Sequence, residues 1–130
     1  MGYLKRFLAT LFSLMPLLSP GVQCEVEHSV AYLKEVSTDH LLYLPAGYGE
    51  TEEEWPLILF LHGSGERGED LEKVKLHGLP AELEKGRSLP AIVVSPQCPL
   101  EMSWDVKALK LLLDDLLRRY RVDPDRVYLT

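Results

Sequence analysis

The chain has 130 residues and a formal net charge of −6, and 46% of its residues are hydrophobic while 26% are charged. This length allows one domain at most, and the composition is that of an ordinary globular protein, which excludes a disordered segment or a repeat array. The excess of acidic residues argues against a partner of the nucleic-acid class, because binding to phosphates depends on Lys and Arg.

The first 24 residues are interpreted as a signal peptide. Lys5 and Arg6 precede an almost wholly apolar stretch from Phe7 to Leu18, and Ser19-Pro20-Gly21 follow it. A short apolar stretch behind two cations is typical of a secretory signal, whereas a membrane span needs about 20 apolar residues. We therefore expect residues 25–130 to form the domain and the mature protein to be exported, periplasmic or secreted, without a transmembrane segment. A lipoprotein attached through Cys24 is the alternative.

Apolar runs and turn residues predict the elements of the domain. A continuous apolar run such as Leu57–Leu61, bounded by Pro56 and glycines, is typical of a strand buried on both faces, as in a parallel sheet. Two strands followed by strand, helix, strand, helix and strand predict a hairpin leading into βαβ units, hence an α/β fold with a mainly parallel sheet. The predicted strands are Val26–Val36, His40–Leu44, Leu57–Leu61, Ala91–Val94 and Arg126–Thr130, and the predicted helices are Asp70–His77, ended by Gly78, and Trp104–Tyr120.

The clearest predicted helix is Trp104–Tyr120. Apolar residues recur along it at steps of three and four, which is typical of a helix with one buried face. The residues of this predicted face are Val106, Leu109, Leu113, Leu116 and Tyr120.

The last predicted strand, Arg126–Thr130, comes at the end of the sequence. An apolar strand with an unpaired edge is an aggregation risk. We therefore expect the chain to be the N-terminal fragment of a larger sheet-containing domain.

A glycine-rich loop, Gly63-Ser64-Gly65-Glu66-Arg67-Gly68, follows the buried strand. Glycines allow tight turns and close approach to the backbone, and the N–H groups of such a loop bind an anion or a developing oxyanion. The spacing also matches the dinucleotide-binding pattern G-x-G-x-x-G. Glu66, Glu69 and Asp70 place negative charge where a pyrophosphate needs positive potential, so this reading is the weaker alternative.

Several segments carry a resemblance to a known family, over about Leu41 to Thr130. Their order resembles that of secreted bacterial esterases of the dienelactone-hydrolase/carboxylesterase group, often described as predicted peptidases or phospholipases, within the α/β-hydrolase superfamily. The segments are Leu59-Phe60-Leu61-His62 with the glycine loop, His77-Gly78-Leu79-Pro80, Val94-Ser95-Pro96-Gln97-Cys98-Pro99, Trp104, Val122-Asp123 and Arg126-Val127-Tyr128-Leu129-Thr130.

The resemblance implies an α/β-hydrolase-type sheet, truncated after about its fifth strand, and hydrolysis of carboxylic esters, or of peptides, through a Ser-His-Asp triad. It implies that the backbone amide of Ser64 is one donor of the oxyanion hole and that Gly63 and Gly65 shape the loop. The nucleophile, the acid and the base are absent from this chain, so it should be inactive on its own. The expected partner is a small-molecule or polymeric ester substrate; no metal or organic cofactor is implied, and no oligomeric state is indicated.

Other candidate side chains are assigned structural roles. His62 is expected to anchor the loop rather than to act as a base, and Trp104 to pack in the core rather than to line the substrate site. His28, His40 and His77 are expected at the surface or in loops, without the spacing of metal ligands. Cys98 is expected to be a half-buried small residue. A non-catalytic secreted binding module with a hydrolase-like half-fold is the alternative function.

Overall fold

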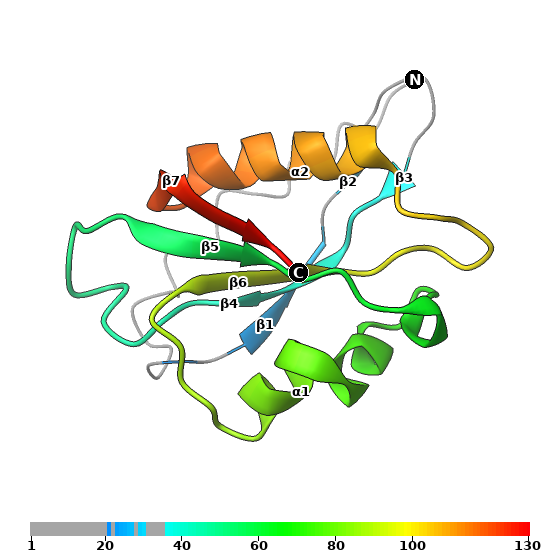
Figure 1. The fold of residues 1–130 in the computed structure, drawn as a ribbon, viewed down its shortest axis with the longest axis horizontal. Coiled ribbons are helices and arrows are strands. Elements are labelled where there is room, and N and C mark those ends of the chain that lie inside the picture. Colours follow the sequence, from blue (N-terminus) through cyan, green and yellow to red (C-terminus); the bar gives the residue numbers. More distant parts are fainter. Residues whose placement is uncertain (1–20, 22, 28, 31–35) are drawn as a thin grey trace, which may run out of the picture.

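The computed structural model describes residues 21, 23–27, 29–30 and 36–130 (Figure 1). The strands within these residues are β1 (Gln23–Val26), β2 (Ser29–Val30), β3 (Val36–Ser37), β4 (His40–Tyr43), β5 (Trp55–Leu59), β6 (Ile92–Pro96) and β7 (Val122–Leu129). The helices are the 3-10 helices η2 (Ser64–Glu66) and η3 (Leu71–Leu76) and the α-helices α1 (Gly78–Glu84) and α2 (Val106–Arg119).

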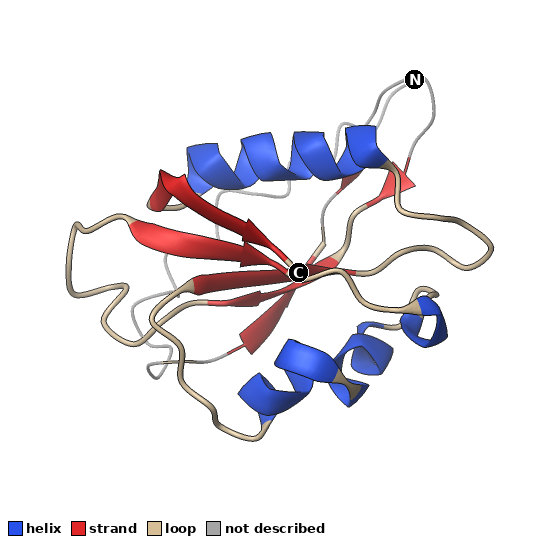
Figure 2. Cartoon of the chain, in the orientation of Figure 1, coloured by secondary structure: helices blue, strands red, loops and turns tan. Residues whose placement is uncertain are grey.

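The main sheet is mixed and has the strand order β1-β4-β6-β5-β7. The first two strands in this order run antiparallel to their neighbours, whereas β5 is parallel to both β6 and β7 (Figure 2). The strands β2 and β3 form a separate antiparallel pair. The predicted α/β class is therefore confirmed, with parallel strands flanked by the antiparallel pair β1 and β4.

Helices cover both faces of the sheet. In Figure 1 the helix α2 lies on one face, and η3 and α1 lie on the other. Successive residues of a strand point to opposite faces, so β6 contributes Ile92 and Val94 to the core under α2 and Val93 to the core on the α1 side. This two-sided burial explains the continuous apolar runs of the two central strands. Among the described residues, no helix is long and apolar enough to cross a membrane.

The helix α2 is confirmed, and its predicted buried face is correct in part, since Leu116 is buried and Leu113 and Tyr120 pack against the core. Asp105 caps the N-terminus, accepting hydrogen bonds from the backbone N–H groups of Lys107 and Ala108 at 2.9 and 3.0 Å. The buried residues are Ala108, Leu112 and Leu116, whereas Val106 is 79% exposed. Leucines surround more than half of this helix, so its periodicity fits several faces, and packing on the sheet selects one.

The N-terminal strand prediction is also wrong in its bounds. The predicted strand Val26–Val36 is not one element, because β1 ends at Val26 and the short strands β2 and β3 pair with each other. Of the predicted signal peptide, residues 1–20 and 22 lie outside the described residues, while Gln23 and Cys24 belong to β1, which pairs with β4. The signal peptide therefore stays a prediction.

Gly78 begins a helix rather than ending one. The segment predicted as the helix Asp70–His77 is the 3-10 helix η3, and α1 follows directly from Gly78. Gly78 has a positive φ of 62°, and a Cβ on it would stand 2.5 Å from the Phe60 ring. Only glycine fits this junction, because any side chain would meet both backbone strain and the ring.

Candidate functional site

The candidate site lies where the carboxyl ends of the parallel strands meet. After β5, the loop His62–Asp70 leads to η3 and α1 on one face, and after β6 the loop Gln97–Asp105 leads to α2 on the other (Figure 1). In open α/β sheets, ligands bind where neighbouring strands send their connections to opposite faces. The end of β7 joins this edge, since the Leu61 N–H donates a hydrogen bond to the carbonyl of Thr130 at 2.8 Å.

The tip of the first loop presents its backbone to solvent. Gly63, Ser64 and Gly65 are all exposed. The space that a Cβ on Gly65 would occupy is open, with nothing within 4 Å. Gly63 is extended, with φ −77° and ψ −170°, and the left-handed residue of this loop is Gly68, with φ 142°. The roles of Gly63 and Gly65 in shaping the loop stay predictions.

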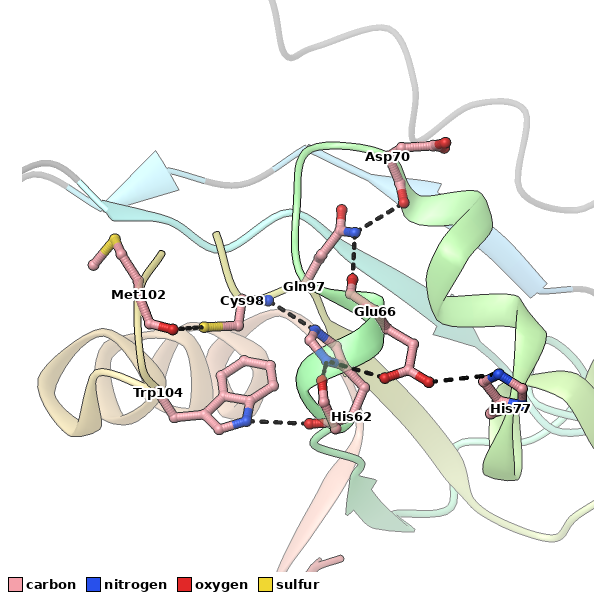
Figure 3. Close-up of polar contacts among 9 residues, drawn as sticks. His62, Glu66, Asp70, His77, Gln97, Cys98, Met102 and Trp104 are labelled. Carbon is pink, nitrogen blue, oxygen red and sulfur yellow. Dashed lines mark hydrogen bonds and ion pairs between the residues drawn. The ribbon is translucent and has the colours of Figure 1, made fainter. Parts of the chain in front are cut away.

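His62 connects the two loops through its ring. Its Nε2 accepts a hydrogen bond from the Cys98 N–H at 2.9 Å, so the proton of the neutral ring is on Nδ1, which donates to the Gly63 carbonyl at 2.6 Å (Figure 3). Both ring nitrogens are therefore engaged, and the side chain is buried. This geometry suits the anchoring role expected from the sequence and leaves no nitrogen to act as a base.

Trp104 packs against the ring of His62. The two rings lie 4.8 Å apart between centroids at an angle of 55°, and the indole Nε1–H donates to the His62 carbonyl at 3.4 Å. Trp104 comes from the segment just before α2, so this contact joins the β5 loop to the α2 side of the sheet. Trp104 thus packs against the anchor of the loop.

Glu66 is buried, whereas Glu69 and Asp70 in the same acidic stretch are exposed. Glu66 is only 9% exposed, and its carboxylate lies 3.9 Å from His62 Nδ1 and 3.9 Å from Nε2 of the exposed His77 (Figure 3). One carboxylate oxygen also lies 3.5 Å from where a Cβ on Gly63 would stand. A pyrophosphate carries permanent negative charge, so this carboxylate beside the glycines disfavours dinucleotide binding.

Two of the remaining candidate residues, His40 and Cys98, are more buried than expected. His40 was expected at the surface, but it is 2% exposed within β4; His28 lies outside the described residues. Cys98 is fully buried, more than expected, and this burial raises the pKa of its thiol although Arg67 opposes the shift. Among the residues described, no group of three His, Cys, Asp or Glu side chains is arranged to hold a metal ion.

Gln97 belongs to one of the segments that carry the resemblance, but the sequence indicated no role for its side chain. Its side-chain Nε2 donates to the carbonyls of Glu66 at 2.7 Å and Asp70 at 2.8 Å (Figure 3). Its position directly after a buried strand that ends at the same sheet edge was the available signal. The partners themselves lie 31 and 27 residues earlier in the chain, where local pattern reading does not reach.

Comparison with known proteins gives matches among solved structures. No protein-family model and no curated protein matches the chain. A thermostable esterase matches with a TM-score of 0.58 and 23% identity, over 81% of this chain and 33% of that one. A ferulic acid esterase from the anaerobic fungus Anaeromyces mucronatus matches with a TM-score of 0.55 and 16% identity, over 86% of this chain and 49% of that one.

A further ferulic acid esterase matches with a TM-score of 0.54 and 15% identity, over 82% of this chain and 49% of that one. The chain thus spans between a third and a half of the length of these esterases. At such identities the likeness establishes the fold, and the narrower dienelactone-hydrolase group stays a prediction. We conclude that the chain has an α/β-hydrolase-type fold of the kind found in esterases.

Proposed function

We propose that this chain is the N-terminal part of a serine esterase and supplies its oxyanion loop. The observation that carries the proposal is the exposed Gly63-Ser64-Gly65 backbone at the carboxyl end of β5, directly beside the end of β7. An oxyanion hole requires N–H donors that are already in place before charge develops in the transition state. The bonds made by His62 and Gln97 hold this loop to the rest of the domain.

The Ser64 amide is the proposed donor. The first N–H groups of a 3-10 helix have no carbonyl partner inside it, and Ser64 is the first residue of η2. The open space beside Gly65 lets a substrate carbonyl approach the backbone closely. Ser64 is not proposed as the nucleophile, because it lies in His-Gly-Ser-Gly-Glu rather than in the Gly-x-Ser-x-Gly turn that presents a nucleophilic serine.

The nucleophile, the acid and the base are proposed to come from residues outside these 130. In support, the sequence contains no Gly-x-Ser-x-Gly motif, and the match covers only 33% and 49% of two esterases of similar structure. The reaction proposed is acyl transfer to the serine followed by hydrolysis of the acyl-enzyme, with an ester or an amide as substrate. Aromatic acid esters are the first substrates to test, since two of the similar structures are ferulic acid esterases. Export through residues 1–24 is part of the same proposal.

The test compares two substitutions of Ser64 in the protein at its native length, assayed with a p-nitrophenyl ester and with methyl ferulate. Ser64→Pro removes the amide hydrogen, and proline is tolerated at the first position of a helix when the preceding residue is extended, as Gly63 is. We expect kcat to fall by about 10²–10³-fold, the usual effect of losing one oxyanion donor. Ser64→Ala keeps the amide and is expected to retain activity.

Three outcomes would contradict the proposal. Absence of ester turnover in the wild-type protein would refute the esterase function. Full activity of Ser64→Pro would refute the role of this amide, and loss of activity in Ser64→Ala would implicate the hydroxyl instead. Urea unfolding of both variants checks that the fold is retained.

A further inference from the structure

The Gln97 side chain joins two loops that are far apart in the sequence. Gln97 is 5% exposed and follows β6 directly. Both hydrogen bonds of its Nε2 go to carbonyls of the β5 loop, those of Glu66 and Asp70. These two carbonyls bracket the second half of the loop, so a single buried side chain sets where that segment lies.

Neighbouring backbone groups extend the same connection. The Cys98 N–H donates to His62 Nε2 at 2.9 Å, and the Gly68 N–H donates to the Cys98 carbonyl at 3.0 Å. The loop is therefore held on both sides of its exposed tip, at His62 before it and at Glu66 to Asp70 after it. We call the Gln97 side chain and the Cys98 backbone the loop clamp.

The loop clamp is itself held by the sheet. The Gln97 N–H donates to the Asp39 carbonyl at 2.9 Å, which continues the pairing of β4 with β6 by one residue. Rigid secondary structure positions a functional group better than a loop does. The loop clamp therefore fixes the position of the β5 loop relative to the central strands of the sheet.

We propose that Gln97 is a positioning residue, which holds the Ser64 amide where the developing oxyanion will lie. This inference rests on the proposed esterase function and assigns it a residue outside the oxyanion loop. A primary amide is suited to the task, because its NH₂ group has two donors and no charge. A leucine here would leave two carbonyls without their partner, and a carboxylate would repel them.

The test uses Gln97→Met, which keeps the length of the side chain without its donors, and Gln97→Glu, in the protein at its native length. Amide hydrogen exchange of residues 63–70 reports loop order, and steady-state kinetics with a p-nitrophenyl ester report its consequence. We expect exchange in this loop to accelerate by about tenfold or more, while α2 is unchanged, since the bonds lost are local. We expect kcat to fall by about 10²-fold with little change in KM, because the Ser64 amide would be displaced from the developing oxyanion.

Tyr43→Phe is the matched control. The Tyr43 hydroxyl accepts a hydrogen bond from the Leu89 N–H at 3.1 Å and lies beside the opposite end of β6. Loss of the Tyr43 hydroxyl also removes a polar contact, but one that lies far from the β5 loop. The free energy of unfolding should therefore fall, while hydrogen exchange in the loop and kcat stay at wild-type values. A kcat loss in this control equal to that of Gln97→Met would overturn the proposal.

A pH profile separates positioning from a general structural effect. A neutral carboxylic acid regains one O–H donor, so Gln97→Glu should recover part of its kcat, relative to wild type, as the pH is lowered toward the pKa of that carboxyl. Gln97→Met should show no such recovery. Unchanged loop exchange in both variants, or unchanged kcat, overturns the inference. If the wild type has no esterase activity, loop-specific exchange still supports the clamp, while the proposed function fails.

Discussion

Replacing Gly78 with alanine should destabilise the protein more than the same change at any other glycine tested. Gly78 has φ 62°, and an alanine in this region costs about 1–2 kcal/mol in backbone strain. Its Cβ would also stand 2.5 Å from the Phe60 ring, and overpacking of this kind costs about 1–3 kcal/mol. The expected loss in the free energy of unfolding is therefore about 2–5 kcal/mol, from the sum of these two effects.

Two other glycines separate the contributions. Gly86 has φ 89° with nothing within 4 Å of its Cβ position, so Gly86→Ala should show only the backbone strain, about 1–2 kcal/mol. Gly49 has open space and no positive φ, so Gly49→Ala should be neutral or slightly stabilising. Urea unfolding followed by tryptophan fluorescence measures all three variants.

The Phe60 contact is tested by a double-mutant cycle. Phe60→Leu combined with Gly78→Ala should lose less stability than the sum of the single changes, by about 1 kcal/mol or more, because the ring that meets the new Cβ is gone. If Gly78→Ala destabilises no more than Gly86→Ala, the reasoning from this contact is refuted. The contact matters for the site because Phe60 lies two residues before His62, at the base of the loop.

Three further predictions concern a helix cap, a carboxyl group and a thiol. Asp105→Ala removes the N-cap of α2 and should lower the free energy of unfolding by about 0.5–2 kcal/mol; an unchanged urea midpoint would contradict this. The hydrogen bond from Arg126 lowers the pKa of Asp123, so the stability from this pair is present at neutral pH and lost as the pH falls through the lowered pKa. An NMR titration in which Arg126→Gln leaves the Asp123 pKa unmoved would disprove the pairing. Burial raises the pKa of Cys98, so the native protein should react with DTNB at pH 8 far more slowly at Cys98 than the urea-unfolded protein does; equal rates would count against it.

Local sequence features were sufficient for much of the architecture. The apolar runs around Leu57–Leu61 and Ala91–Val94 predicted the two central strands within two residues, because a strand buried on both faces has no polar alternation to obscure it. Turn residues and helical spacing likewise placed α2 and the glycine loop between the correct elements. The α/β class followed from the order of these elements alone.

The tertiary structure decided what depends on contacts between distant segments. The buried face of α2 was set by the sheet, since the leucines allowed several faces, and Glu66 and His40 became buried only because other elements cover them. The role of Gln97 rests on carbonyls 27 and 31 residues away, and that of Gly78 on the Phe60 ring. Sequence by itself determined the two central strands, α2 and the position of the glycine loop, because these follow from neighbouring residues. How that loop is held was decided by packing, because hydrogen bonds and steric contacts between loops leave no periodic pattern along the chain.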